Sequence, residues 1–256
     1  MLPYDEAGSG EVVLLIHAGV ADRSMWGEHL DWLAEAGFRA VALDLPGFGE
    51  AVLEDRLQAP WDDVLQTLRG LDIACAALVG NSLGAAVALR VAAVAPAAVS
   101  ELVLISPPPL VPNPSPALRA AWDAENTALE HGDIDGAVAA VVAAWTQPNA
   151  PEALRERVAS MQRRAFELQA AAGEVHEAPD PLERHPEVLA ELEIPALVAA
   201  GEHDMADFRD AAEQLAEALP LTRHAVVRGA GHLAPLEAPD EFRRLVLDLL
   251  RNRTPR

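Results

Sequence analysis

The stretch Ala76-Ala77-Leu78-Val79-Gly80-Asn81-Ser82-Leu83-Gly84 joins an apolar run to the Ala-rich segment Ala85–Ala93. We expect a buried strand over Ala76–Val79, a sharp turn at Ser82 and then a helix. Such a turn forces strained backbone angles on its central residue, and glycines two before and two after it relieve the crowding. The serine hydroxyl then stands at a helix N-terminus, where the dipole and free N–H groups favour developing negative charge. The pattern predicts Ser82 as a nucleophile.

Five further short apolar runs are distributed along the chain, and most are followed by helix-like segments. Strands buried on both faces are continuously apolar rather than alternating. These runs therefore predict an α/β fold, with a mostly parallel sheet and helices on both faces. No repeat of the kind that builds solenoids or propellers is evident. The five predicted strands are Val12–Ile16, Ala40–Leu43, Leu102–Ile105, Ala196–Ala199 and Ala225–Val227.

The alternation of strands and helices stops after Leu102–Ile105. The Pro-rich stretch Ser106–Pro116 can form neither a regular helix nor a central strand. A mostly helical region follows to about Ala172, and a second irregular stretch, Ala178–Pro181, leads back to the next strand. We therefore expect an α/β core over 1–106 and 187–256 and a helical insertion over 107–186. An insertion that leaves the carboxyl end of a strand would cover the active site as a cap.

A serine nucleophile needs a base, and His232 is the best placed of the eight histidines. It ends the loop Gly229-Ala230-Gly231-His232, directly after the predicted strand Ala225–Val227, so it would share a sheet edge with Ser82. We expect His17 to be hydrogen-bonded and to shape its own loop. The other histidines are expected at surface, packing or solvated positions: His29, His131, His176, His185, His203 and His224.

The base in turn needs an acid that fixes its tautomer. Asp204 lies beyond the end of the strand Ala196–Ala199, at the same sheet edge as His232. Glu202 and Asp207 are rivals in the same loop. Asp44 also follows a strand, but we expect it to belong to a structural turn. Asp204 is our predicted acid.

An oxyanion hole would complete the site. Val12–Ile16 leads into the loop His17-Ala18-Gly19-Val20. We expect the backbone N–H groups of Gly19 and Leu83 to bind a tetrahedral oxyanion, and losing one such donor typically costs about 3–4 kcal/mol of barrier.

Together these features resemble the α/β-hydrolase superfamily: a His-Gly-type loop, a G-x-S-x-G turn, an acid after a late strand and a histidine after the last strand. Smaller details are similar to the cap-bearing branch that includes 3-oxoadipate enol-lactonases, carboxylesterases and C–C bond hydrolases. The resemblance covers nearly all of the chain except the insertion. The details are Asp44-Leu45-Pro46-Gly47-Phe48-Gly49, Ile194–Val198 leading to Gly201-Glu202-His203-Asp204, and Gly231-His232-Leu233-Ala234-Pro235-Leu236-Glu237-Ala238-Pro239.

Three departures from the family pattern matter. Ala18 stands where the family usually has Gly. Few residues precede Val12, so the usual opening hairpin is shortened and we expect fewer than eight strands. Asn81 resembles the C–C hydrolases, yet Leu233 follows the histidine where those enzymes usually carry Trp, which weakens that alternative.

The resemblance implies a serine hydrolase of the carboxylesterase and lactonase class (EC 3.1.1), acting through an acyl-enzyme on a small, partly apolar substrate. The alternatives are a C–C bond hydrolase of the same superfamily and a low-turnover, receptor-like ligand-binding protein. Epoxide hydrolases and dehalogenases are disfavoured, because they place Asp where this chain has Ser82. Residues of the insertion that we expect to line a substrate pocket are Trp122, Trp145, Met161 and Phe166.

Composition narrows the partners. The formal net charge is −21 and every basic residue is Arg, so binding to nucleic acid is not expected. We expect no cofactor and no metal, because neither clustered Cys and His nor G-x-G-x-x-G occurs. No secretory signal or membrane span is evident, so we expect a cytoplasmic protein whose partner is a small ester or lactone. The single cysteine, Cys75, lies in an apolar run and is expected to be buried.

Overall fold

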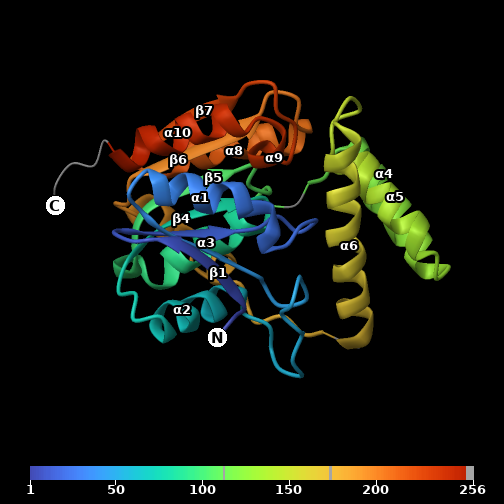
Figure 1. The fold of residues 1–256 in the computed structure, drawn as a ribbon, viewed down its shortest axis with the longest axis horizontal. Coiled ribbons are helices and arrows are strands. Elements are labelled where there is room, and N and C mark those ends of the chain that lie inside the picture. The colour runs from blue at the N-terminus through green and yellow to red at the C-terminus, as the bar shows by residue number, and fades with distance from the viewer. Residues whose placement is uncertain (112, 173–174, 252–256) are drawn as a thin grey trace.

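The computed structural model describes residues 1–111, 113–172 and 175–251 (Figure 1). Its centre is a seven-stranded sheet with the strand order β1-β3-β2-β4-β5-β6-β7. Strands β2 to β7 run parallel to their neighbours, and β1 pairs with β3 in the antiparallel sense. The strands are β1 (Tyr4–Gly8), β2 (Val12–Ile16), β3 (Arg39–Leu43), β4 (Ala76–Asn81), β5 (Val99–Ile105), β6 (Ala196–Gly201) and β7 (Thr222–Val227).

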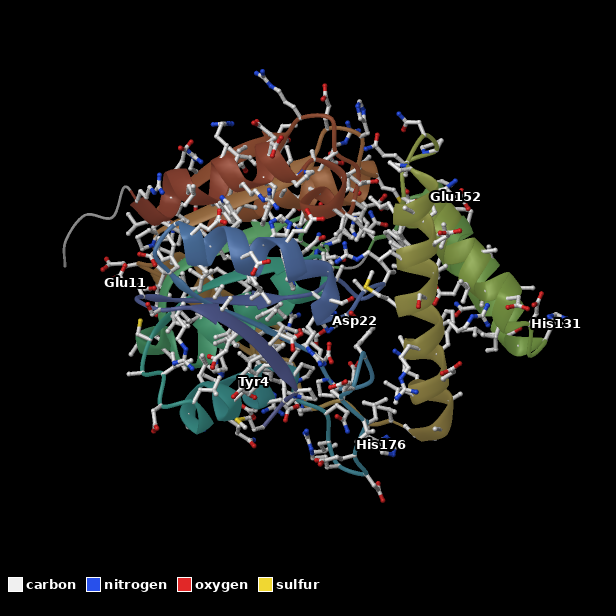
Figure 2. The ribbon with its side chains drawn as sticks, in the orientation of Figure 1. Tyr4, Glu11, Asp22, His131, Glu152 and His176 are labelled. Carbon is white, nitrogen blue, oxygen red and sulfur yellow. The ribbon has the colours of Figure 1, made fainter. Side chains whose placement is uncertain are left out.

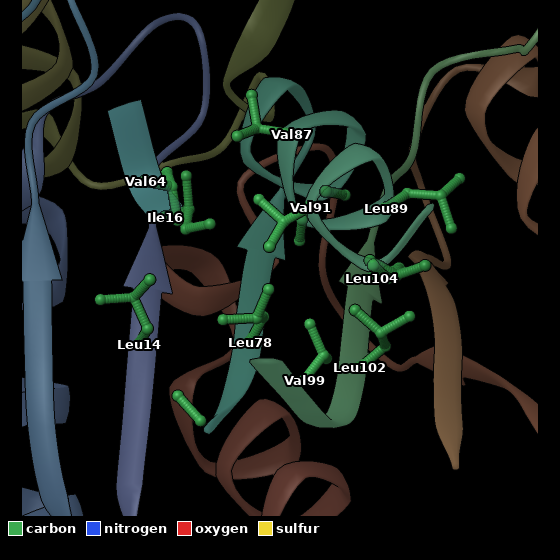
Figure 3. Packing of buried hydrophobic residues seen from close by; sticks show 14 of the residues in the cluster. Leu14, Ile16, Val64, Leu78, Val87, Leu89, Val91, Val99, Leu102 and Leu104 are labelled. Atoms are coloured by element: carbon green, nitrogen blue, oxygen red, sulfur yellow. The ribbon is translucent and has the colours of Figure 1, made fainter. Parts of the chain in front are cut away.

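Helices cover both faces of the sheet, as predicted. One face packs against α2 (Pro60–Gly70), α3 (Leu83–Val94) and α8 (Ala206–Ala218), and the other packs against α1 (Gly27–Glu35) and α10 (Pro239–Arg251). Alternate residues of one strand serve the two cores. Leu14 and Ile16 of β2 point into the first core, part of which Figure 3 shows, and Val13 and Leu15 point into the second.

The short connecting helices are mostly single turns. They are η1 (Arg23–Trp26), η2 (Pro96–Ala98), α7 (Pro181–Arg184), η3 (Pro186–Glu191) and α9 (Ala234–Glu237). Within the described residues, no helix is long and apolar enough to cross a membrane.

The six strands predicted from apolar runs are all present, so the α/β prediction is confirmed. Strand β1 was not predicted from the sequence. This edge strand carries Asp5 and Glu6, and all of its residues are partly or fully exposed, so it lacks a continuous apolar run. With β1 included, the sheet has seven strands, fewer than eight, as expected.

Between β5 and β6 the chain forms three long helices that lie together beside the sheet (Figure 1). They are α4 (Pro116–Glu130), α5 (Ile134–Trp145) and α6 (Glu152–Ala172). The hydroxyl of Ser115 and the carboxylate of Asp133 cap the first turns of α4 and α5. Figure 2 shows His131, at the turn between these two helices, far from the sheet. Pro112, inside the predicted irregular stretch, lies outside the described residues.

The helix α6 is the part of this segment that reaches the core. A guanidinium N–H of Arg157 donates to the carbonyl oxygen of Ser24, and the sulfur of Met161 lies 3.4 Å from the Ser24 hydroxyl. Farther along, Arg164 donates to the carbonyl oxygen of Gly49 at 3.2 Å. The long helix is therefore tied to the loops that follow β2 and β3.

Two sequence expectations were wrong. Cys75 is exposed, because strand pairing begins only at Ala76 and the cysteine belongs to the preceding turn. His29, expected to be solvated, is buried on the inner face of α1. Its Nε2 donates to the carbonyl oxygen of Pro235 at 3.0 Å, and its ring lies 5.0 Å from that of Phe242.

Candidate functional site

Ser82 occupies a strained turn between β4 and α3. Its φ is 54° and its ψ is −113°, a conformation that non-glycine residues rarely adopt. Two backbone hydrogen bonds hold the residue there. Its N–H donates to the carbonyl oxygen of Ile105 at 2.8 Å, and its own carbonyl oxygen accepts from the N–H of Ala86 at 3.0 Å. The strand–turn–helix geometry predicted from the sequence is present.

The glycines of Gly80-Asn81-Ser82-Leu83-Gly84 are required by space. A Cβ atom at Gly80 would lie 2.2 Å from the carbonyl oxygen of Gly84. A Cβ atom at Gly84 would lie 2.1 Å from the carbonyl oxygen of Ile16. Helix α3 can therefore begin directly against the ends of β4 and β2 only because these two side chains are missing.

His232 and Asp204 meet in a buried pair. The Nδ1 of His232 lies 3.0 Å from Oδ1 and 3.2 Å from Oδ2 of Asp204. Oδ1 also accepts from the N–H of Met205 at 2.8 Å, which orients the carboxylate. With an acceptor at Nδ1, the neutral imidazole carries its proton there and leaves Nε2 unprotonated.

The rival carboxylates in the same loop have other partners. Glu202 accepts from the N–H of Gly229 at 2.9 Å, and Asp207 accepts from the N–H of Ser115 at 2.7 Å. Gly201 allows the close approach of the two loops, since a Cβ there would lie 2.0 Å from the carbonyl oxygen of Gly231. Of the three candidates, Asp204 is the carboxylate that contacts His232.

Asn81 connects the serine turn to the histidine loop. Its side-chain amide donates to the carbonyl oxygen of His232 at 3.1 Å and to that of Ile105 at 3.3 Å. Ser82 is the next residue, so the two loops are held together. Among the described residues, however, no hydrogen bond joins the Ser82 hydroxyl to Nε2 of His232. Such bonds are often long without a substrate and tighten in the complex.

The two predicted oxyanion donors belong to adjacent segments. Leu83 is the first residue of α3, so its N–H has no acceptor within the helix. A Cβ atom at Gly19 would lie 3.6 Å from Cβ of Leu83, an ordinary van der Waals contact. The structure therefore brings the backbones of both residues to the turn that holds Ser82.

His17, in the loop after β2, uses both ring nitrogens for structure. Nδ1 donates to the carbonyl oxygen of Ala18 at 2.8 Å, and Nε2 accepts from the N–H of Leu45 at 2.9 Å. Complete burial lowers the pKa of this imidazole below its ordinary value. The hydrogen-bonded, loop-shaping role expected for His17 agrees with these contacts.

Asp44 holds the next loop in a similar way. Its carboxylate accepts from the backbone N–H groups of Arg23 and Glu50, both at 2.8 Å, and forms an ion pair with the Arg23 guanidinium. The carboxylate side chain is fully buried. Asp44 is thus part of a structural turn, as expected.

Aromatic rings surround His232. The ring centroid of Phe208, in the first turn of α8, lies 4.3 Å from that of His232, and the centroid of Trp145 lies 4.6 Å away. Phe208 was not predicted from the sequence, and its place four residues after Asp204 is the signal that could have suggested it. His232 also borders a hollow of about 480 Å³ that is lined by the segment Trp145–Asn149 as well.

The four residues expected to line a pocket are dispersed. Trp145 contacts His232, Met161 contacts Ser24, and Phe166 is buried in the same apolar cluster as Trp145. Trp122 on α4 remains 41% exposed. The structure thus places Trp145 at the site and Trp122 on the outside.

Comparisons with known proteins agree with this fold. A model of the alpha/beta hydrolase family matches residues 13–245. The 2-hydroxy-6-oxo-6-phenylhexa-2,4-dienoate hydrolase of Comamonas testosteroni is 28% identical over 266 aligned positions, covering 99% of this chain and 92% of that protein.

Solved structures are similar along almost the whole chain. A thermophilic esterase from Thermogutta terrifontis superposes with a TM-score of 0.80 at 25% identity, covering 98% of this chain and 93% of that one. The enol-lactonase from Burkholderia xenovorans shares the fold, with a TM-score of 0.78, 22% identity and coverage of 98% and 96%. Since the family model also spans most of the sequence, the chain belongs to the alpha/beta hydrolase family.

Proposed function

We propose that this hydrolase cleaves a carboxylic ester or lactone, with Ser82 as nucleophile, His232 as general base and Asp204 as the acid that orients the base. One observation carries the proposal: the buried Asp204–His232 pair is tied, through the side chain of Asn81, to the strained turn that presents Ser82. Nucleophilic catalysis by serine requires a serine, a histidine base and a carboxylate that orients the histidine.

In the first stage, Oγ of Ser82 attacks the substrate carbonyl carbon while Nε2 of His232 takes the hydroxyl proton. Asp204 accepts the Nδ1–H of the resulting imidazolium and stabilises its charge. The N–H groups of Gly19 and Leu83 receive the oxyanion. When the bond to the leaving oxygen breaks, His232 returns the proton to that oxygen and an ester of Ser82 remains.

In the second stage, water attacks the carbonyl carbon of that ester. His232 takes a proton from the water, and the hydroxide oxygen forms the new carbon–oxygen bond. The bond to Oγ of Ser82 then breaks, and the imidazolium reprotonates the serine. The products are a carboxylic acid and the free enzyme.

The helices α4 to α6 would act as the cap of this site, within the insertion predicted over 107–186. Three contacts support this assignment: Trp145 lies against His232, Met161 against Ser24, and Arg164 donates to Gly49. The apolar side chains of Trp145, Met161 and Phe166 favour a partly apolar substrate. Trp122 is exposed on α4 and is not needed in this proposal.

Cleavage of a carbon–carbon bond is the second candidate. The relative from Comamonas testosteroni is named for a 6-oxo dienoate, a substrate without an ester group, and it matches 99% of this chain. Asn81 beside the nucleophile also favours this alternative, whereas Leu233 after the histidine does not. Both candidates use the same three side chains, so substrate comparison distinguishes them.

The test compares wild type with Ser82→Ala, and with Ser160→Ala as a matched change at an exposed serine of α6. We expect wild type and Ser160→Ala to hydrolyse p-nitrophenyl acetate and butyrate, and kcat of Ser82→Ala to fall by about 10⁶-fold. Equal rates in all three proteins would contradict the proposal. Faster turnover of 2-hydroxy-6-oxo-6-phenylhexa-2,4-dienoate than of any ester or lactone would favour carbon–carbon cleavage.

A further inference from the structure

Glu237 joins two parts of the molecule that are distant in sequence. It ends α9, five residues after His232. Its Oε2 accepts from the N–H of Gly231 at 2.8 Å, directly beside the histidine. Its Oε1 accepts from the N–H of Gln147 at 2.9 Å, two residues beyond the end of α5. One carboxylate therefore bridges the histidine loop and the α4–α6 segment.

The same two segments touch at two further points. The side-chain amide of Gln147 donates to the carbonyl oxygen of Gly229 at 2.8 Å. The ring of Trp145 lies against the ring of His232. The segment Trp145–Gln147 thus contacts the histidine loop through a ring and a side-chain amide, and it contacts Glu237 through a backbone N–H.

The junction leaves no spare room. A Cβ atom at Gly231 would lie 3.0 Å from Cγ of Gln147 and 3.0 Å from Oε2 of Glu237. A side chain at this position would therefore require Gln147 or Glu237 to move by a few tenths of an ångström. A displacement of Gln147 or Glu237 would be transmitted to Gly231 and then to His232, the next residue.

Backbone N–H groups, rather than a basic side chain, hold the carboxylate of Glu237. The hydrogen-bond partners of its carboxylate, among them Gln147 and Gly231, are backbone N–H groups, and no arginine pairs with it among the described residues. Burial raises the pKa of this carboxyl above its ordinary value. Burying a carboxylate without a cation costs free energy. We therefore attribute the role of Glu237 to the connection that it makes between the two segments.

We infer that Glu237 is a positioning residue, which fixes the loop of His232 to the end of α5 so that base and cap are held as one unit. The inference rests on the proposed role of His232. The end of α5 would then support the catalytic base, in addition to any contact that it makes with substrate.

The test uses Glu237→Gln, which keeps the size of the side chain but presents an NH₂ group to one of the two N–H donors. We expect kcat for p-nitrophenyl butyrate to fall by about 10–100-fold, because small misplacements of a catalytic group cost up to about this much. KM should stay within about threefold, since the pocket is retained, and the rate of fluorophosphonate labelling at Ser82 should fall in parallel with kcat.

Two further variants keep the test sharp. Gln147→Ala removes the side-chain bond to Gly229 but keeps the backbone N–H that donates to Glu237, and it should lower kcat less, by about three- to tenfold, which corresponds to the usual 0.5–1.5 kcal/mol of one hydrogen bond. Glu217→Gln, at an exposed glutamate of α8, is the matched control and should match wild type within about twofold.

Three outcomes would overturn the inference. The first is kcat of Glu237→Gln within twofold of wild type. The second is a loss that follows only the fraction of unfolded protein, as measured by thermal unfolding. The third is a rise in KM at unchanged kcat, which would mean that Glu237 serves substrate binding alone. Failure of the proposed function is a separate result: wild type itself would then take no fluorophosphonate at Ser82.

Discussion

Two buried histidines with neighbouring aspartates lie at the carboxyl edge of this sheet, and they differ in one respect. His17, near Asp44, has both ring nitrogens bonded to backbone groups. His232 has Nδ1 bonded to Asp204, and the described residues offer no hydrogen bond to its Nε2. The two aspartates also differ in their partners, since Asp44 pairs with the Arg23 guanidinium and Asp204 contacts the imidazole of His232.

The comparison shows what separates a structural histidine from a candidate base. Residue type, burial and position after a strand are shared by His17 and His232. What differs is the partner of the second ring nitrogen: the N–H of Leu45 donates to Nε2 of His17, and the described residues supply no such partner for Nε2 of His232. We expect substitutions at the His232 pair to reduce rate, and substitutions at the His17 pair to reduce stability.

Of substitutions at the two aspartates, Asp204→Asn should have the larger effect on rate. An amide can donate to Nδ1 and so favour the wrong tautomer of His232, which lowers kcat by about 10⁴-fold in a comparable arrangement. Because the side chain keeps its shape, the melting temperature should change little. Ester turnover and thermal unfolding, measured on the same preparation, check the expected fall in kcat and the expected small change in melting temperature. A drop in kcat below tenfold would show that Asp204 does not orient the base.

Asp44→Asn should give the reverse pattern. It removes the buried carboxylate that pairs with the Arg23 guanidinium, which keeps its ion pairs with Asp5 and Glu50, and losing hydrogen bonds to a charged group typically costs about 1.5–3 kcal/mol of unfolding free energy. The kcat of the folded fraction should stay within about tenfold of wild type. Urea unfolding together with active-site titration separates the two quantities. A 10⁴-fold loss of kcat in a stable protein would break the comparison.

Acid should destabilise the protein through its buried neutral histidines. Burial lowers the pKa of His29 to about 4, against 6.5 in the unfolded chain, and it lowers the pKa of His17 as well. Between these values the unfolded state binds the proton and the folded state does not, so stability falls as the pH falls from 6.5 toward 4. For His29 this loss amounts to about 3 kcal/mol.

The measurement for this prediction is the unfolding free energy of wild type and His29→Gln at several pH values. The difference between the two proteins should shrink as the pH falls and become constant below about pH 4. A difference that does not vary between pH 7 and pH 4 would mean that His29 is not held neutral.

The smallest effects should come from the aromatic neighbours of the two histidines. Phe208 lies 4.3 Å from His232, and Phe48 lies 4.9 Å from His17. Aromatic contacts of this kind contribute about 1 kcal/mol. We expect Phe208→Leu to lower kcat by about fivefold, and Phe48→Leu to lower unfolding free energy by about 1 kcal/mol with little effect on kcat. A loss of stability alone in Phe208→Leu, together with a loss of kcat in Phe48→Leu, would contradict the roles given to the two histidines.

Features that depend on local sequence were predicted well. Apolar runs located six strands, and Gly80 and Gly84 marked the turn at Ser82, because their need for space arises within a few residues. The proximity of Asp204 and His232 followed from the rule that parallel strands end at one edge. The edge strand β1 was missed because it lacks an apolar run. The exposure of Cys75 was missed for the opposite reason, because the cysteine lies in an apolar run but just before strand pairing begins at Ala76.

Contacts between distant segments were beyond sequence reasoning. Phe208 contacts the ring of His232. Glu237 accepts a hydrogen bond from Gln147, which is ninety residues away in the sequence. Which of four aromatic and apolar side chains would approach the site also depended on how α4 to α6 pack. That packing brought Trp145 to His232 and left Trp122 exposed.

The most direct test of the central claim is the rate at which a fluorophosphonate labels Ser82 in wild type, His232→Gln and His17→Gln, followed by intact mass and peptide mapping. We expect one adduct, on Ser82, formed several thousand-fold or more slowly in His232→Gln, because removing the base of such a triad costs up to about 10⁶-fold. In His17→Gln the folded protein should still be labelled, at a rate within about tenfold of wild type, with reduced stability as the main defect. Equal labelling rates in wild type and His232→Gln, or loss of labelling in folded His17→Gln alone, would contradict the account.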